Sequence, residues 1–206
     1  MKKFVSLLLA LTMVLALFAG CASEKPAETT APETTTAPET TAAPVPETSA
    51  QEILENVWAS YMKNVGEEMQ FPVAGGDEAN TTMDNAGKID PKNTNYLGGV
   101  MNVPAELHAQ IDDAASLMHM MNANTFTCGA YHLTEGSDID AFVKTLTDGI
   151  KGTQWICGFP DQLVVATLYG EYVIAFYGSM DLIPLVKTQL TTAYADAVIA
   201  AEESLA

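Results

Sequence analysis

Arginine is absent from this 206-residue chain, and all nine of its basic residues are lysines. Against them stand 26 acidic residues, which give a formal net charge of −17. Nucleic-acid binding depends on basic side chains that neutralise phosphates, so this composition excludes a nucleic-acid partner. The absence of arginine also removes the side chain that holds phosphate or carboxylate through two parallel hydrogen bonds.

Cysteine is also scarce, with three residues at positions 21, 128 and 157. None belongs to a Cys-x-x-Cys pair, which excludes a thioredoxin-like redox motif and the paired spacing of structural zinc sites. Outside the cytoplasm Cys128 and Cys157 are candidates for one disulfide. The alternative is that both remain buried free thiols.

Catalytic and cofactor motifs are missing as well. Ser116 lies near His119 but has no Gly-x-Ser-x-Gly context, so a hydrolase triad is not supported. The neighbouring acids Asp112 and Asp113 point apart on any regular element, which makes surface solvation their default role. The sequence therefore predicts no cofactor and gives no support for an enzyme.

The longest apolar run lies at the N-terminus, from Phe4 to Phe18, after two lysines and before Ala19-Gly20-Cys21. A basic tip, a short apolar stretch and small residues at the cut predict a secretory signal peptide over residues 1–20. A cysteine directly after Ala-Gly resembles the signal of bacterial lipoproteins, in which the thiol is lipidated. The resemblance implies an acyl anchor such as palmitate on Cys21. Ordinary secretion and an uncleaved membrane helix are the alternatives.

Residues 21–50 are rich in Thr, Pro, Glu and Ala, and the string Ala-Pro-Glu-Thr-Thr occurs at 31–35 and again at 37–41. Beyond alanine methyl groups only Val45 could join a core, so a disordered tether is expected. Such tethers resemble those of Gram-positive surface lipoproteins, which implies the outer face of the cell membrane. The acyl chains would be the only membrane contact, because anionic headgroups repel an acidic domain.

Residues 51–206 are long enough for one globular domain with a real core. Helical periodicity, turn residues and β-rich runs predict the order of the elements. The first half contains a helix from Ser49 to Gly66, a loop over 67–100, a short helix over 104–111 and a hairpin with arms at 117–121 and 126–133. The second half contains a helix from Ser137 to Gly152, a hairpin with arms at 163–169 and 172–177, and a last helix from Ser179 or Asp181. Two segments stay open between helix and strand, 114–121 and 196–201. This order predicts an α+β domain (α-ββ-α-ββ-α), an antiparallel sheet of two hairpins with helices packed on one face.

The run Met118-His119-Met120-Met121 gathers soft ligands that suit Cu(I). If the first hairpin turns at Ala123-Asn124, His119 lies opposite Cys128, and the candidate set is His119, Met118, Met120 and Cys128. The alternative is core packing, because methionine fills irregular gaps and no four-ligand spacing accompanies the run. The sequence therefore predicts no resident metal and leaves this set as the candidate to check.

Aromatic residues gather in the second half of the domain, where they could line an apolar groove for a ligand. The candidates are Trp155, Phe159, Tyr169, Tyr172 and Tyr177. Plain core packing is the alternative, because aromatic side chains dominate cores.

The run Asp113–Thr127, the segment Gln154–Asp161 and the hairpin after it resemble short Gram-positive lipoproteins of unknown function. Some of these carry the label bacteriocin transport accessory protein, whose thioredoxin-type members need a Cys-x-x-Cys that this chain lacks. The resemblance therefore implies no mechanism.

We expect a lipid-anchored extracytoplasmic protein that binds a small ligand, a peptide or a partner protein without catalysis. The alternative is a cell-wall or peptide hydrolase whose site cannot be recognised from one sequence. A pocket that joins His119 or His132 to a buried carboxylate would favour the enzyme, and a dry helix-on-sheet core would favour binding.

Overall fold

The computed structural model describes residues 47–156 and 158–205. Its elements are α1 (Ala50–Asn64), the 3₁₀ helix η1 (Glu67–Met69), β1 (Val73–Gly75), β2 (Thr82–Met83), β3 (Gly87–Ile89), α2 (Thr94–Gly99), the 3₁₀ helix η2 (Ala105–Gln110), β4 (Ile111–His119), β5 (Phe126–Leu133), α3 (Ile139–Lys151), β6 (Gln162–Leu168), β7 (Tyr172–Gly178), α4 (Ile183–Ala193) and β8 (Val198–Ser204). The strands form one antiparallel sheet of eight strands in the order β2-β1-β4-β5-β7-β6-β8, with β3 also paired to β4. In the described part of the chain, no helix is both long and apolar enough to cross a membrane.

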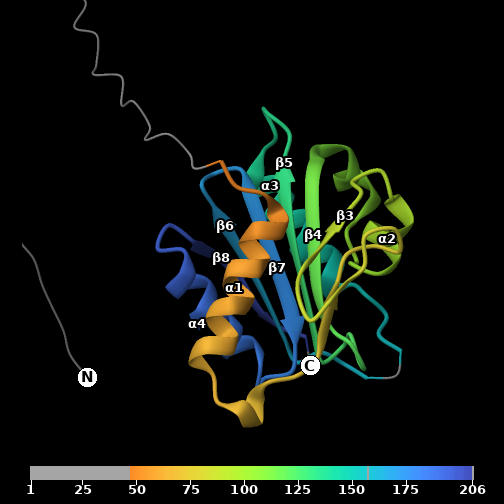
Figure 1. Ribbon diagram of the computed structural model, residues 1–206. Helices are drawn as coiled ribbons and strands as arrows, with labels where there is room; N and C mark the ends of the chain where they lie inside the picture. Colours follow the sequence, from red (N-terminus) through yellow and green to blue (C-terminus); the bar gives the residue numbers. More distant parts are fainter. Residues whose placement is uncertain (1–46, 157, 206) are drawn as a thin grey trace, which may run out of the picture. The chain divides into compact units, whose positions relative to one another are not determined.

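The two predicted hairpins form the centre of this sheet, and the predicted α+β class is confirmed (Figure 1). Strands β4 and β5 make the first hairpin, β6 and β7 the second, and β5 pairs with β7 between them. The open segment 114–121 is strand as far as His119, where β4 ends. The other open segment enters β8, an edge strand that pairs with β6.

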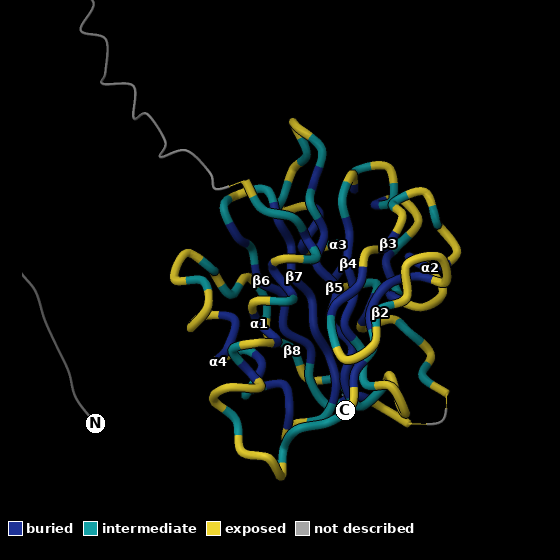
Figure 2. The backbone as a smooth tube through the Cα atoms, in the orientation of Figure 1, coloured by how far each residue is buried: buried dark blue, intermediate teal, exposed yellow. Residues whose placement is uncertain are grey.

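Helices cover both faces of the sheet, so the expectation of helices on one face is wrong. Along β7, Tyr172, Ile174 and Phe176 pack with α1 and α4, whereas the alternate residues pack with α2, η2 and α3. All seven residues of β7 are buried, and the central strands form the dark interior of Figure 2. A strand that is apolar at every position has two faces to remove from water, so one helical layer is insufficient.

The start of α1 is fixed by a capping box of Ser49 and Glu52. The Ser49 side chain accepts from the Glu52 backbone N–H at 3.2 Å, and the Glu52 carboxylate accepts from the Ser49 backbone N–H at 2.9 Å. The Ala50 backbone N–H, which has no partner within the helix, donates to the carboxylate of Asp113 in β4 at 2.8 Å. These bonds attach the start of α1 to one end of the sheet.

The predicted loop over 67–100 instead contains η1, β1, β2, β3 and α2. Its strands have two or three residues each, which is too short for a hydrophobic period to be visible. Glycine allows them to pack closely: a Cβ on Gly75 would lie 2.2 Å from the Ser116 carbonyl oxygen and 2.3 Å from the Gly87 nitrogen. The backbones of β1, β3 and β4 therefore meet without side chains between them.

Two predicted boundaries move by one residue. The N-cap of α3 is Asp138 rather than Ser137, and its side chain accepts from the Ala141 backbone N–H at 3.0 Å. The β6–β7 turn is centred on Tyr169 and Gly170, both with positive φ, rather than on Gly170 and Glu171. Positive φ at both central residues is the geometry of a type I′ turn.

Candidate ligand-binding groove

The five aromatic residues predicted to line one groove are divided between the two faces of the sheet. Trp155 and Tyr177 pack together on the α3 face, with ring centroids 5.2 Å apart. Tyr172 is buried on the α1 face, and Tyr169 packs against that same core from the β6–β7 turn. Phe159 is 69% exposed, so it lines neither core. Residues 172 and 177 are an odd number apart on one strand, so their side chains point to opposite faces.

The register of the first hairpin separates the candidate copper ligands. Leu117, not His119, lies opposite Cys128, because the turn is centred one residue earlier than Ala123-Asn124. Cys128 points into the α1 core, whereas Met118 packs against the core on the other face. Met120 follows the end of β4 and is 47% exposed. The four residues are therefore not brought together.

His119 has a structural role instead. Its ring stacks on Phe71 at 5.2 Å, and its Nδ1 accepts from the backbone N–H groups of Met121 and Asn122 at 3.1 and 3.3 Å. An Nδ1 that accepts leaves the ring proton on Nε2, so neither nitrogen presents a free lone pair. Among the described residues, no three His, Cys, Asp or Glu side chains are grouped to hold a metal.

Cys128 is buried in the α1 core, and this burial raises the pKa of its thiol. Its predicted partner Cys157 lies outside the described residues, so the disulfide stays a prediction. Residues 1–20, Cys21 and the tether up to position 46 also lie outside the part that the structure describes.

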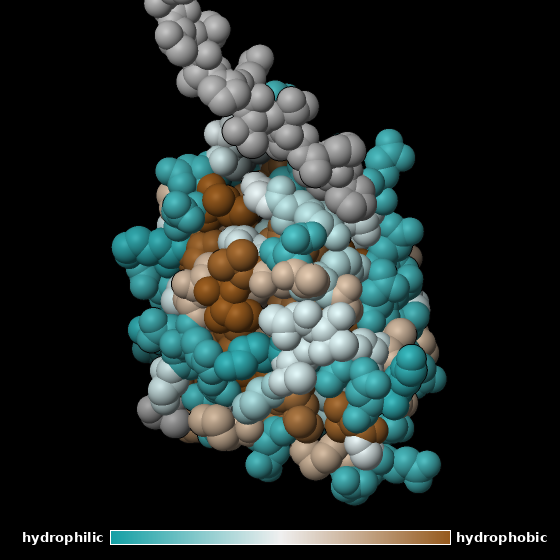
Figure 3. All heavy atoms as spheres, turned by 90° about the vertical axis from the view of Figure 1, so that its left-hand side faces the viewer, coloured by the Kyte–Doolittle hydropathy of each residue, from teal (hydrophilic) through white to brown (hydrophobic). Residues whose placement is uncertain are grey.

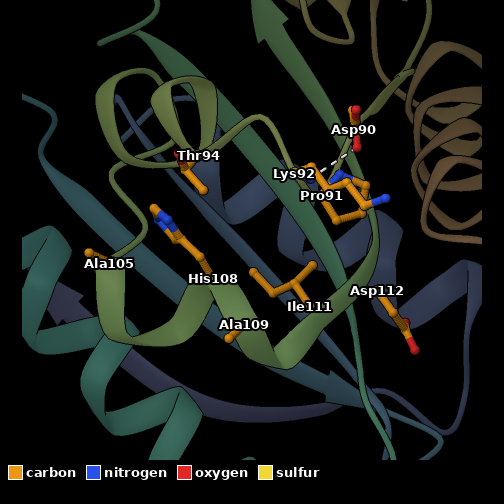
Figure 4. Close-up of a pocket in the computed structure, with 9 residues that line it drawn as sticks. All are labelled: Asp90, Pro91, Lys92, Thr94, Ala105, His108, Ala109, Ile111 and Asp112. Atoms are coloured by element: carbon orange, nitrogen blue, oxygen red, sulfur yellow. Dashed lines mark hydrogen bonds between the residues drawn. The ribbon is translucent and has the colours of Figure 1, made fainter.

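A groove of about 830 Å³ opens between the segment that leads into α2 and the η2 helix (Figure 4). Its lining is partly apolar and partly polar: Pro91, Ala105, Ala109 and Ile111 supply the apolar surface, and Asp90, Lys92, Thr94, His108 and Asp112 supply the polar groups. In Figure 4, Thr94, Ala105 and His108 lie toward one end, and Asp90, Lys92 and Asp112 toward the other. We call this feature the Asp90–Asp112 groove.

One wall of the groove is a turn over Asp90-Pro91-Lys92-Asn93. The Asp90 carboxylate accepts from the Lys92 backbone N–H at 2.9 Å, and the Asp90 carbonyl accepts from the Asn93 backbone N–H at 2.8 Å. Asn93 then caps α2, because its side chain accepts from the Tyr96 backbone N–H at 3.1 Å. Local polar contacts therefore shape this wall before any ligand is considered.

A buried carboxylate holds that wall in place. Asp77 is 1% exposed and accepts from the backbone N–H groups of Asp90, Asn80 and Ala79 and from the side-chain amides of Asn80 and Asn93. Burial by itself raises the pKa of Asp77, but these hydrogen bonds outweigh it and hold the pKa below the ordinary value of 3.8. The carboxylate stays charged and joins the loop after β1 to the groove.

The opposite wall is η2, which follows Pro104. His108 Nε2 lies 2.9 Å from the Val103 carbonyl oxygen, so this nitrogen carries the ring proton and donates it. That assignment leaves Nδ1 as an acceptor. Pro104 packs closely on α3, because a Cβ on Gly149 would lie 2.4 Å from its Cγ atom. This wall is therefore fixed to the core.

Asp112 at one end of the groove hydrogen-bonds to His132 Nδ1, and His132 Nε2 lies 3.7 Å from the Glu171 carboxylate. The Asp112 side chain is 49% exposed, so it is not the buried carboxylate that would favour a hydrolase. Within residues 47–156 and 158–205 no hydroxyl group is recorded in a hydrogen bond with His132. The pair therefore lacks the nucleophile that a triad requires.

Sequence reasoning did not identify the groove, because its residues come from a predicted loop and the helix after it. Two local signals mark its walls, the Asp-Pro-Lys-Asn turn and Pro104 at the start of η2. Neither signal shows that the two segments face each other across a gap. Comparison with known proteins adds no assignment, because no family model, no curated protein and no solved structure matches this chain.

Proposed function

We propose that this protein is a lipid-anchored, extracytoplasmic binding module without catalytic activity, and that the Asp90–Asp112 groove is its ligand site. The groove itself is the observation that carries the proposal. Its volume of about 830 Å³ falls within the range of about 300 to 1,000 Å³ usual for small-ligand pockets, and it combines apolar walls with a few polar groups.

The polar groups indicate the kind of ligand. Lys92 lines the groove, and within the described residues its ammonium group has no ion pair, whereas Lys88, Lys144, Lys151 and Lys187 each have one. Asp90 and Asp112 already accept hydrogen bonds from protein groups. The ligand is a small molecule with an apolar body, which contacts Ile111, and a carbonyl or carboxylate group that accepts from Lys92.

The anchoring part of the proposal rests on the sequence features before residue 47. A signal-like segment that ends at Cys21 and a Thr/Pro/Glu-rich stretch support lipidation and placement on the outer face of a Gram-positive cell membrane. Metabolic labelling with a fatty acid tests this part: label should enter the full chain and disappear in Cys21→Ser. Equal label in both proteins would refute the anchor and leave the groove unaffected.

A ligand screen tests the groove. The full chain, purified in detergent from the membrane fraction, is screened by thermal shift against small apolar carboxylates and amides, with Ala109→Trp and Ala195→Trp in parallel. Both alanines are exposed, but only Ala109 lines the groove. We expect hits that stabilise wild type and Ala195→Trp and have no effect on Ala109→Trp. Hits that stabilise all three proteins equally would place binding elsewhere.

A further inference from the structure

One end of the sheet carries a set of exposed apolar side chains that do not line the Asp90–Asp112 groove. They lie on three segments, the β4–β5 turn, the connection from α3 to β6 and the residues after β7: Met120, Met121, Ile156, Phe159 and Met180. Met121, Ile156 and Phe159 are 78, 80 and 69% exposed. We call this set the apolar tip. The turn and the connections that carry it lie at the lower end of Figure 1, and on the face shown in Figure 3 apolar (brown) residues lie among hydrophilic (teal) ones at that end.

The three segments are attached to one another. The Asn124 side-chain amide donates to the carbonyl oxygens of Ile156 and Gly158 at 3.3 and 3.1 Å. The Ser179 backbone N–H donates to the Thr125 carbonyl at 2.9 Å. A Cβ on Gly178 would lie 2.1 Å from that same oxygen, so the segments are in close backbone contact. The apolar tip is therefore a preorganised surface.

A small pocket of about 210 Å³ adjoins the tip. The stacked rings of Phe71 and His119 and the side chain of Leu182 form its apolar lining, and Glu68 and Asp181 place two carboxylates on it. An aromatic face next to two carboxylates is suited to an ammonium or guanidinium group on an alkyl chain.

The tip and Thr48, near the first described residue, lie at opposite ends of β7. The Tyr172 hydroxyl donates to the Thr48 carbonyl oxygen, which places the start of the domain at the first residue of β7. Gly178 ends the same strand at the apolar tip. Seven residues of β strand separate the two ends, about 20 Å.

We propose that the apolar tip docks a partner protein through a segment that carries a lysine or arginine beside apolar side chains. The basic side chain enters the pocket, its alkyl part packs on Phe71 and Leu182, and its charge lies near Glu68 and Asp181. Charge complementarity selects this partner, because Glu67 and Asp161 add two more carboxylates at this end. This proposal is independent of the groove and of its ligand.

The same charges argue against other occupants. A second copy brings another net charge of −17 and has no arginine to offer. An anionic bilayer repels the carboxylates around the tip, although the apolar side chains alone would suit a lipid surface. Exposed apolar groups next to carboxylates that have no ion pair within the described residues therefore fit a basic and apolar segment best.

The test measures binding of a short fluorescent peptide of alternating leucine and lysine to the full chain in detergent, at physiological salt, by anisotropy. A matched peptide with glutamate in place of lysine is the control probe. Two variants address the tip, Met121→Ser/Phe159→Ser/Met180→Ser and Asp181→Lys. Val100→Ser/Val198→Ser removes exposed apolar groups elsewhere and serves as the control protein.

We expect each tip variant to bind the lysine peptide at least about tenfold more weakly than wild type, the control protein to bind it normally, and the glutamate peptide to bind poorly throughout. Circular dichroism confirms that the variants are folded, and Asp181→Lys checks the result without loss of any apolar group. Equal loss in the control protein, or equal binding of the glutamate peptide, would overturn the proposal. Binding of the wild type but not the tip variants to zwitterionic vesicles in the absence of peptide would assign the tip to lipid instead.

Discussion

Asp77 accepts a hydrogen bond from the Asp90 backbone N–H at 2.9 Å, and this contact connects a buried charge to the wall of the groove. A buried carboxylate is tolerated only when donors surround it, and the five donors around Asp77 satisfy that condition. Asp77 is thus a positioning residue for the turn that carries Pro91 and Lys92.

Asp77→Asn should lower the free energy of unfolding by about 2 kcal/mol, because the amide removes the charge and turns an NH₂ group toward other donors. The folded state lowers the pKa of Asp77, so its contribution is present above the ordinary value of 3.8 and is lost as pH falls through the lower folded value. Urea denaturation at neutral and acid pH should show the difference between wild type and variant shrinking below pH 3.8. The exposed Asp196→Asn is the control, and a difference that does not change with pH would contradict this role.

We expect the free energy of unfolding to fall at alkaline pH because of two tyrosines. Burial raises the pKa of Tyr61 and of Tyr172 from 10.0 to about 12, so the folded state favours the neutral phenol. Their contribution is present below pH 10 and is lost as pH rises from 10 toward 12. Tyr61→Phe and Tyr172→Phe should each cost about 1 kcal/mol at neutral pH, from the hydrogen bonds to Met69 and Thr48, and should flatten the alkaline decline.

Denaturant titrations at a series of alkaline pH values check this, with Tyr169→Phe as the control. The Tyr169 hydroxyl makes no hydrogen bond that the structure records among the described residues. An alkaline decline of the same steepness in all four proteins would show that these phenols are not responsible.

Gly75→Ala should destabilise the fold by about 2 to 3 kcal/mol, because the new Cβ would overlap backbone atoms of Ser116 and Gly87 that cannot move aside. Gly99→Ala is the matched control, since a Cβ there meets nothing within 4 Å. Thermal unfolding of the two variants compares them directly. Equal melting temperatures would contradict the close packing of β1 and β3 on β4.

Cys128 should be protected in the folded protein. Burial both raises the pKa of its thiol and blocks access, so in a Cys157→Ser background a thiol reagent should react slowly with it at neutral pH. Reaction should become fast in denaturant, as followed by mass spectrometry. Rapid modification of the folded chain would show that the α1 core opens at Cys128.

The sequence predicted the long helices and strands, in which the side-chain pattern repeats several times, and missed the strands of two or three residues. The helix over Ile139–Lys151 and the two central hairpins follow from side-chain spacing and turn residues. The strand Val73–Gly75 has three residues and is held by close glycine contacts with partners far along the chain, which no local pattern records. Residues 126–133 are almost all buried, as expected of a strand covered on both faces, but Thr127, Gly129 and His132 interrupt its apolar pattern, and the sequence therefore predicted helices on one face only.

The predicted aromatic groove and copper site are wrong for a related reason, because their residues are not brought together in the fold. Tyr172 and Tyr177 are close in sequence, but the alternation of a strand sends them to opposite faces. The pairing of His119 with Cys128 depended on the centre of one turn, and a shift of one residue there moves every partner by two. The groove joins Asp90 to Asp112 across a loop and a helix, and only the fold brings them together.

Methyl NMR of the full chain in detergent tests the groove most directly, with the isoleucine methyl groups labelled and a stabilising ligand from the screen titrated in. Ile111 lines the groove, whereas Ile174 and Ile183 are buried in the α1 core on the other face of the sheet. We predict a saturable shift of the Ile111 methyl signal, no shift of Ile174 or Ile183, and loss of the response in Ala109→Trp. An unchanged Ile111 signal at ligand concentrations that stabilise the protein would contradict the assignment of the groove as its binding site.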